Sequence, residues 1–577
     1  MTGIELPTVT HNDVHNNSPN TKRLSFWTIV VIAANTMNGP GLTTLPAVSY
    51  AAGKLTLVVL ILLSTFLTSY VVKRLCVLMW TKQRDVHTSS MHLHNSSTNI
   101  TGDDDPMSDK SHNHHSEDHE HYTPLLEESD MVALSGDIWT HPHQRPTVRR
   151  VASIAMVGCA LALALAQMML CAKIADAMIV ASFGSVCGVN MSPTSILFGD
   201  TSSRLHCTSN LSMQPFAPIE ERARNLASLP EPDGAVIIEI KKNNRPQQIP
   251  PTTPSTVPPM SLLTGGLVIA AAITISLASV DLDSMLTAQF FLFGCLLLAC
   301  LRFCYTLTHI DKWSVNIKSV GAGGGYSFPE APLANLIKGP RPFDAVGPVL
   351  FNFAFVVTAP PLSCGAQGGL QTAIQALVAA CVIMGTLYSI LGWVGASAAA
   401  IAEEENDDTN LLSLVLRGTP TKWDHLSVIV FGISQLAAIP VYCELAHETL
   451  QTHVQIFATP RYNFLLCHVA PWLICALTYN SALFESFVEW SSLLLLGFCN
   501  FSLPLLLDIS WIKQQQQHLG HTTKSTRKTT LRMGWVVWMF GMVTATITAV
   551  IVQRMTASAF LAEGAFMCTV LLILNYF

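Results

Sequence analysis

Four residues that disfavour a helix, Asn38-Gly39-Pro40-Gly41, stand in the middle of a charge-free segment that runs from Leu24 to Gly53. The segment is long enough to cross a bilayer, which takes about 20 apolar residues. A helix break at that depth leaves backbone N–H and C=O groups without partners, so it is tolerated only inside the protein or along a watery cavity. The N-terminal end of the second half-helix would suit a carboxylate, and the free carbonyls of the first half would suit a cation. The break therefore predicts a binding site.

A second charge-free segment, Ala345 to Ala402, contains Thr358-Ala359-Pro360-Pro361. Two consecutive prolines remove two backbone donors and clash with the preceding turn, so a helix is not expected to pass through undisturbed. Breaks in predicted spans one and six fit corresponding positions of an inverted repeat, which indicates a transport site. The alternative is that each break is a kink that serves only helix packing, because Gly and Pro are common in membrane helices.

The rest of the chain provides enough apolar segments to build a membrane protein around these breaks. It has 577 residues, of which 50% are hydrophobic and 12% charged, whereas a soluble domain carries about 25% charged residues. The predicted spans are 26–52, 55–80, 151–183, 262–282, 285–307, 345–364, 370–402, 426–446, 462–483, 485–509 and 533–552. The fold class is therefore an all-α polytopic membrane protein, with a transmembrane domain over 24–553, and 554–577 could add a short twelfth span.

This composition excludes several classes of function. A soluble enzyme is not compatible with so many spans, and there is no Gly-rich nucleotide-binding loop, so neither an enzyme nor a cofactor is expected. The net charge of −6 gives no indication of nucleic-acid binding. Lys and Arg residues next to the span ends place the N-terminal tail, 1–23, on the cytosolic side. The loop between spans five and six, with four Lys and Arg residues, is the exception.

Two long polar insertions interrupt the spans. The first, 81–146, contains ten of the twenty histidines and is predicted to be a disordered cytosolic loop that transport does not require. The second, 184–259, is predicted to be extracytosolic and ends in a Pro/Thr-rich stretch. Its sequons at Asn190 and Asn210 make glycosylation possible, and Cys187 and Cys207 make a disulfide possible.

At this point the chain resembles the amino acid/auxin permeases of the amino acid–polyamine–organocation superfamily. "NTMNGPGLTTLPAVSYAAG" (35–53) looks like their first span, and "ISLASVDLDSM" (275–285) looks like their turn between spans four and five. "PLANLIKGPRPFDAVGPVLFNFAFVVTAPPL" (332–362) resembles their approach to span six, and "SLLLLGFCNFSLPLLLDI" (492–509) resembles their tenth span. The resemblance covers about 24–552, apart from the insertions.

The resemblance implies about eleven spans with a five-plus-five inverted repeat and broken helices one and six. It also implies secondary active transport of amino acids driven by protons or sodium. Carried over by position, the residues expected to bind substrate are Asn35, Thr36, Asn38, Gly39, Pro40, Gly41, Phe353, Phe355, Val356 and Thr358. Because no Asp or Glu lies beside either break, a neutral amino acid is the expected substrate.

The coupling ion is predicted to be a proton. Sodium-coupled members pair the Asn of span one with a hydroxyl of span eight just before its Pro, but here Leu436 and Ala438 stand at those positions. A proton needs only one titratable group in the aqueous path. The residues considered for ion coupling are Asn35, Asp176, Ser434, Glu444 and His447.

Two other functions remain open from the sequence. The run "SHNHHSEDHEH" (111–121) could bind zinc through its imidazoles, which would fit a metal-ion carrier with a regulatory loop. Against it, the spans contain no helical His-x-x-x-Asp pair that would coordinate a metal, so no metal ligands are assigned. A transporter-like sensor that binds amino acids and signals through its cytosolic segments would have the same sequence features.

Overall fold

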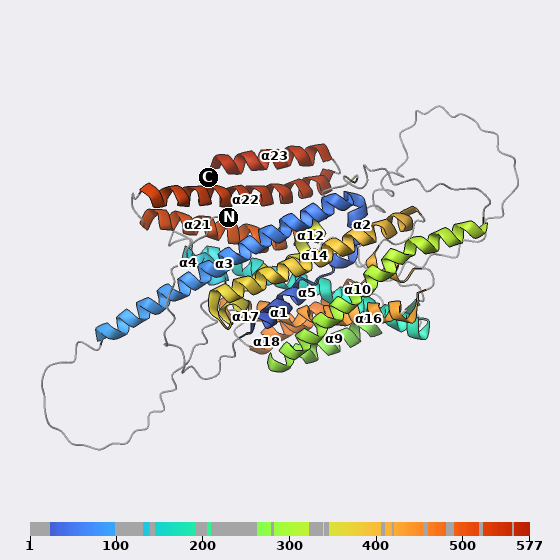
Figure 1. The fold of residues 1–577 in the computed structure, drawn as a ribbon. Coiled ribbons are helices and arrows are strands. Elements are labelled where there is room, and N and C mark those ends of the chain that lie inside the picture. Colours follow the sequence, from blue (N-terminus) through green and yellow to red (C-terminus); the bar gives the residue numbers. More distant parts are fainter. Residues whose placement is uncertain are drawn as a thin grey trace, which may run out of the picture.

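Long apolar helices make up most of the computed structural model and make the chain a multi-pass membrane protein (Figure 1). The structure describes residues 24–97, 131–138, 145–190, 205–208, 262–278, 282–321, 339, 345–404, 410–417, 420–453, 460–479, 490–518, 523–556 and 559–576. Within these residues, eight helices are long and apolar enough to cross a bilayer, and three shorter apolar helices, Phe26–Met37, Gly265–Leu277 and Gly564–Ile573, accompany them. The predicted fold class is confirmed, whereas the number of spans and the inverted repeat remain predictions.

The described helices follow one another along the chain as three groups. In the first half they are α1 (Phe26–Met37), α2 (Gly41–Ala52), α3 (Lys54–Ser97), α4 (Met131–Ile138), α5 (Arg145–Phe183), α9 (Gly265–Ala278) and α10 (Leu282–Gly321). The middle of the chain forms α12 (Val346–Asn352), the 3₁₀ turn η2 (Val356–Thr358), α13 (Ala359–Cys364), α14 (Gly369–Glu404), α15 (Leu411–Val415), α16 (Lys422–Gln435) and α17 (Ala438–His453). The last part forms α18 (Pro460–Phe464), the π-helical turns η4 (Leu465–Val469), η5 (Ser492–Leu496) and η6 (Phe498–Ser502), and α19 (Ala470–Leu477), α21 (Leu503–His518), α22 (Thr523–Thr556) and α23 (Ala559–Tyr576).

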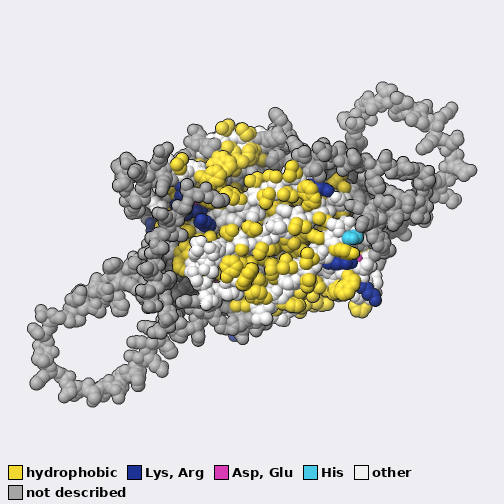
Figure 2. All heavy atoms as spheres, viewed as in Figure 1, with side chains coloured by type: hydrophobic (Ala, Val, Ile, Leu, Met, Phe, Trp, Pro, Cys, Tyr) yellow, Lys and Arg dark blue, Asp and Glu magenta, His cyan; other side chains and the backbone are white. Residues whose placement is uncertain are grey.

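The two broken helices lie inside the bundle. The long helix α14 packs against α1, α2 and α3, and α5 packs against α9, α16 and α17 (Figure 1). Residues Ile29 to Met37 of α1 are all buried, as are Val349 to Phe351 of α12. In contrast, apolar side chains cover the middle of the outer face, and Lys and Arg gather toward its two ends (Figure 2). This distribution is the one expected of a bundle surrounded by lipid.

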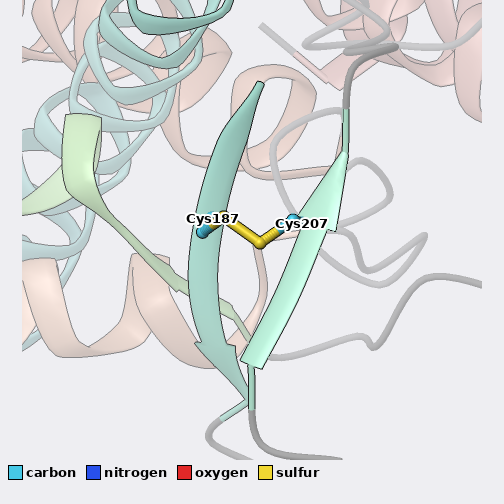
Figure 3. Close-up of a disulfide and its surroundings, with 2 residues drawn as sticks. All are labelled: Cys187 and Cys207. Atoms are coloured by element: carbon cyan, nitrogen blue, oxygen red, sulfur yellow. A yellow bond between two sulfur atoms is a disulfide. The ribbon is translucent and has the colours of Figure 1, made fainter. Parts of the chain in front are cut away.

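A small sheet covers one end of the bundle. Its strand order is β2-β1-β3, formed by Leu205–Thr208, Val186–Asn190 and Leu262–Thr264, and both pairings are antiparallel. Cys187 stands opposite Cys207 in the register, and the two form the disulfide that the sequence made possible (Figure 3). Of the two sequons, Asn190 ends β1, and Asn210 lies outside the described residues.

Three charged side chains join the helices α3, α21 and α22. Arg74 of α3 donates from Nε and Nη2 to the two oxygens of Asp508 on α21, at 2.9 and 2.7 Å. Arg532 of α22 donates to Asp508 Oδ1 at 2.9 Å. The carboxylate has no exposed surface. A buried charge is tolerated only when it is paired and hydrogen-bonded, so this cluster holds the three helices in one arrangement.

Part of the first insertion is ordered against the bundle, which differs from the expectation of disorder over 81–146. The helix α3 continues to Ser97, and α4 packs on α5 and α21 with Met131, Val132 and Ile138 almost fully buried. Gln514 of α21 donates to the carbonyl of Ile138 at 2.7 Å. The run "MVALSGDI" is short but mostly apolar. Burial of its apolar side chains stabilises this helix although the sequence on both sides of it is polar. The His-rich run lies outside the described residues.

We expect α4 to contribute to stability. Val132→Asp should lower the melting temperature of the purified protein by several degrees, because an unpaired carboxylate would replace a buried side chain. The measurement is a thermal melt followed by size-exclusion chromatography in detergent. Ala133→Asp, at a partly exposed position on the same helix, is the control. Equal melting temperatures for wild type and Val132→Asp would show that α4 is only loosely attached.

The C-terminal segment forms α23, which packs along α22 at the edge of the bundle (Figure 1). Its apolar part, Gly564–Ile573, is shorter than the other spans. The segment is therefore helical, as a short twelfth span would be.

Candidate functional site

The break in the first span lies where the sequence predicts it. The helix α1 ends at Met37, α2 begins at Gly41, and the N–H of Asn38 donates to the carbonyls of Ala34 and Asn35 at 3.1 Å. Two tyrosines from other spans hold the last carbonyls of α1. The hydroxyl of Tyr388 on α14 donates to Met37 O at 2.5 Å, and that of Tyr442 on α17 donates to Thr36 O at 2.6 Å.

Asn38 joins the break to α16 through its side chain and to α5 through its main-chain carbonyl. Its Nδ2 donates to Ser434 Oγ at 3.2 Å, and its Oδ1 accepts from Gln435 Nε2 at 2.8 Å. Its main-chain carbonyl accepts from Gln167 Nε2 of α5 at 3.1 Å. All four of these residues are buried. The break is therefore surrounded by amide and hydroxyl groups, none of which carries a charge.

One turn earlier, Asn35 connects the first span to the eighth. Its Nδ2 donates to the carbonyl and to Oε1 of Gln289 on α10, at 2.9 and 2.6 Å. Gln289 Nε2 in turn donates to Ala437 O at 2.8 Å. Ala437 lies between the end of α16 and the start of α17, so the eighth span is interrupted as well. The sequence predicted a continuous span here, although Pro440, close to the interruption, is a residue that disfavours a regular helix.

The break in span six lies earlier than the prolines. The helix α12 ends at Asn352, and Val356–Thr358 form a 3₁₀ turn, so the break lies at Phe353 to Phe355. Pro360 and Pro361 lie in the first turn of α13, where a missing N–H costs nothing. The expectation that the helix breaks at Thr358 to Pro361 is therefore corrected, because proline there begins a helix.

The residues predicted to bind from span six are all buried in this segment. The ring of Phe353 packs edge-on against that of Tyr388, with centroids 5.8 Å apart, and Phe355 and Val356 have no exposed surface. Thr358 Oγ1 donates to the carbonyl of Phe355 at 2.7 Å, so its hydroxyl bonds within the same 3₁₀ turn. Asn500 Oδ1, from η6, accepts from the N–H of Val357 at 3.3 Å.

The two breaks touch each other through glycines. A Cβ on Gly39 would lie 3.0 Å from the ring of Phe351, and a Cβ on Gly41 would lie 2.5 Å from Asn352 Oδ1. Only a residue without a side chain lets these backbones approach so closely. Gly39, Pro40 and Gly41 thus bring the first and sixth spans together at the level of the breaks. Thr36, which was also predicted to bind substrate, donates from Oγ1 to the carbonyl of Ala33 in its own helix.

Five buried amide atoms at this junction have no hydrogen-bond partner. They are Asn35 Oδ1, Gln167 Oε1, Gln435 Oε1, and both Nδ2 and Oδ1 of Asn352. A buried polar atom left unpaired costs about 1–3 kcal/mol. A polar solute that entered this junction would find both acceptors and a donor. We call the four side chains that carry these atoms, together with Asn38, the amide cluster.

The residues considered for ion coupling lie in three separate places. Asn35 lies in the last turn of α1 before the break, and Ser434 Oγ accepts a hydrogen bond from Asn38 within it. Asp176 lies near the C-terminal end of α5. Its carboxylate accepts hydrogen bonds from the N–H of Gly266 at 2.8 Å and from the hydroxyl of Tyr479. It therefore caps the N-terminus of α9. Glu444 and His447 lie along α17, beyond Tyr442.

Sequence reasoning missed most of the partners of the breaks. These are Gln167, Gln289, Asn352, Tyr388, Gln435, Tyr442 and Asn500. Gln167 and Gln289 are the clearest cases, since each is a single amide in an apolar run, as in "ALAQMML" around Gln167. A lone amide in a span was the available signal, because lipid provides no partner for it.

We expect the tyrosine hydroxyls to stabilise the break. Tyr442→Phe should cost about 1–3 kcal/mol, because it leaves the buried carbonyl of Thr36 without a donor. The measurement is the melting temperature in detergent. Tyr305→Phe, on the exposed face of α10, is the matched control and should melt as wild type does. If Tyr442→Phe melts at the same temperature as the control, another group or a water molecule donates to the carbonyl of Thr36 in its place.

Comparison with known proteins gives structural matches at low sequence identity. No family model and no curated sequence matches the chain. Two crystal structures of a manganese transporter from Eremococcus coleocola are among the structures that match. The form in complex with an aromatic bis-isothiourea substituted compound has a TM-score of 0.45 and 10% identity, covering 98% of this chain and 96% of that one. A histidine-to-alanine mutant has a TM-score of 0.44 and 10% identity, covering 95% and 92%. Likeness at this level does not identify the solute.

Proposed function

We propose that the protein is a secondary transporter that carries a neutral amino acid past the breaks in spans one and six. The observation behind this proposal is the amide cluster, in which five unpaired polar atoms are buried around the break of the first span and at its contact with α12. Discontinuous helices meeting near the middle of a bundle are a recurring site architecture in transporters. A solute that pairs with these atoms would remove their desolvation cost, which gives it a reason to bind.

The charge of the site favours a zwitterion over an ion. Every side chain that bonds within the amide cluster is neutral, so a cationic or anionic side group would find no partner of opposite charge. An amino acid backbone has an acceptor group and a donor group and no net charge. Its carboxylate fits the N-terminal end of α2, and its ammonium fits unpaired amide oxygens such as Asn35 Oδ1.

A second candidate function is the transport of a divalent cation. Asn35, Gln167 and Gln435 each present an unpaired amide oxygen, and hard cations bind such oxygens. The two crystal structures named above belong to a manganese transporter. Against this candidate, no group of three or more His, Cys, Asp or Glu side chains in the described part of the chain is placed to hold a metal ion. A doubly charged ion would therefore enter a site without a counter-charge.

A direct comparison of solutes tests the proposal. The purified protein in liposomes should exchange labelled alanine, leucine or glutamine in counterflow, and prefer them to arginine and lysine. Manganese influx should stay at the level of empty liposomes. Preference for arginine or lysine would contradict a neutral substrate, and manganese influx without amino acid exchange would establish the cation carrier. Binding of amino acids without turnover would identify a sensor.

The same liposomes decide the coupling ion. We propose proton coupling, so uptake should respond to an imposed pH gradient and not to an inward sodium gradient at equal pH. Ser434 Oγ lies at the break and could supply one oxygen of a sodium site. Strong sodium stimulation with no response to pH would therefore assign the amide cluster and Ser434 to sodium.

A further inference from the structure

One carboxylate on α17 faces imidazoles from two different helices. Glu444 Oε1 lies 3.5 Å from Nδ1 of His447, one turn further along α17. Glu444 Oε2 lies 3.6 Å from Nε2 of His468, which belongs to the π-helical turn η4 of the neighbouring span. The rings of the two histidines are 6.2 Å apart. The three side chains therefore form one group, which we call the Glu–His group.

The group runs from the surface into the protein. The side chain of Glu444 is 53% exposed, that of His447 is 18% exposed, and that of His468 is 4% exposed. His447 Nε2 is buried without a hydrogen-bond partner. The ring of Phe464 stacks on His468 with centroids 4.7 Å apart and holds it in place. A π-helical turn is uncommon and often marks a functional position, here because it aims His468 at α17.

Few other titratable groups face this site. The thiols of Cys443 and Cys467 lie within electrostatic range of Glu444. The face of α5 that packs here presents apolar side chains, which include Val157, Ala160 and Leu161. On its other side, His468 borders a narrow crevice lined also by Met168, Thr274, Ile439, Cys443 and Trp472. The binding of a proton to the group therefore depends mainly on the charges of Glu444, His447 and His468 themselves.

The helix α17 connects the Glu–His group to the broken first span. Ala437, just before α17, accepts a hydrogen bond from Gln289, and Tyr442 of α17 holds Thr36 at the end of α1. Glu444 follows Tyr442 by two residues, and it lies about 10 Å along the chain direction from the break at Ala437. Any shift of α17 at the group is thus transmitted to the carbonyls of the broken first span.

We propose that Glu444, His447 and His468 form the proton-binding site of the transporter, which rests on the proposed function. A proton that enters from the exposed carboxylate binds an imidazole nitrogen and converts the group from one negative charge to none. The imidazolium and the carboxylate then pair and hold α17 against η4. Release of the proton removes that pairing, so α17 is free to move with the first span and the solute.

Transport measurements in liposomes test the site. For Glu444→Gln and His468→Gln, the ratio of pH-driven accumulation to counterflow exchange of the same amino acid should fall by about tenfold. Addition of the amino acid should no longer move protons, as followed by a trapped pH-sensitive dye. The matched control is His309→Gln, a histidine on α10 that bonds to the carbonyl of Tyr305, and it should behave as wild type. Unchanged ratios in both variants, or an equal loss in His309→Gln, would overturn the assignment.

A second measurement does not depend on the solute. The ¹⁵N chemical shifts of the histidine rings report their protonation directly, and the signals of His447 and His468 are assigned by their loss in His447→Gln and His468→Gln. In Glu444→Gln the pH midpoint of these ring signals should be lower than in wild type, because the carboxylate that lies 3.5 Å from His447 and 3.6 Å from His468 is gone. An unchanged midpoint would exclude a shared proton. If wild type exchanges no amino acid but the midpoint still shifts, the proposed substrate is wrong while the proton site stands.

Discussion

Gly41→Leu is expected to abolish transport while the protein still reaches the membrane. A Cβ at Gly41 would lie 2.5 Å from Asn352 Oδ1 and 2.8 Å from the carbonyl of Pro348. The carbonyl of Pro348 belongs to the backbone and cannot turn away as a side chain can. The helices α2 and α12 would therefore have to separate at the point where the two breaks meet. A leucine would also cover the unpaired amide of Asn352, one of the groups offered to a solute.

The experiment compares uptake by Gly41→Leu with uptake by Gly294→Leu, normalised to protein in the membrane. Gly294 lies within the spanning helix α10, and a Cβ there would meet open space, so this variant should transport as wild type does. Wild-type uptake by a well-expressed Gly41→Leu variant would mean that the break serves only helix packing. Poor expression of both variants would instead show a general intolerance of added bulk, and Gly41→Ala would then be compared with Gly294→Ala.

Asp508→Asn is expected to cause the largest loss of stability. The substitution leaves Arg74 and Arg532 together without a counter-charge, and removal of one partner from a buried ion pair costs about 3–5 kcal/mol. The loss should appear as a lower melting temperature and as less folded protein in the membrane. The transport rate per folded molecule should change far less, since Asp508 is no part of the amide cluster.

Lys513→Gln is the control for this prediction, because it removes a charge from an exposed position of the same helix. A melting temperature for Asp508→Asn that equals the control would show that the two arginines find water or lipid headgroups instead. A double variant, Arg74→Gln with Asp508→Asn, should recover part of the stability, because only Arg532, whose side chain is partly exposed, then lacks its partner.

The sequence alone determined that the chain crosses a membrane many times. Charge-free segments of sufficient length have no stable place in water, and their backbone must form helices in lipid. The break at Asn38 to Gly41 was equally readable, because Gly-Pro-Gly disfavours a helix in any surroundings. The possible disulfide between Cys187 and Cys207 followed from the predicted side of their loop, and strand pairing brings the two together.

Proline was a less certain guide, since its effect depends on its position in a helix. Pro360 and Pro361 begin α13, so the sixth span breaks at Phe353 to Phe355 instead of at the prolines. The apolar run at Met131 to Ile138 was too short to stand out in a polar insertion, and only its burial against α5 and α21 makes it helical. Local sequence shows neither where α13 begins nor that Met131 to Ile138 are buried. Both depend on how the helices pack against one another.

The site itself was decided by tertiary structure. Asn38 was foreseen, but its partners Gln167 and Gln435 lie 129 and 397 residues away along the chain. His468 meets Glu444 only because a π-helical turn places it toward α17. A lone amide in a span signals that it must find a hydrogen-bond partner in the absence of water, but it does not say which one. The packing of the helices makes that choice, since it alone sets which faces of distant spans meet at the same depth.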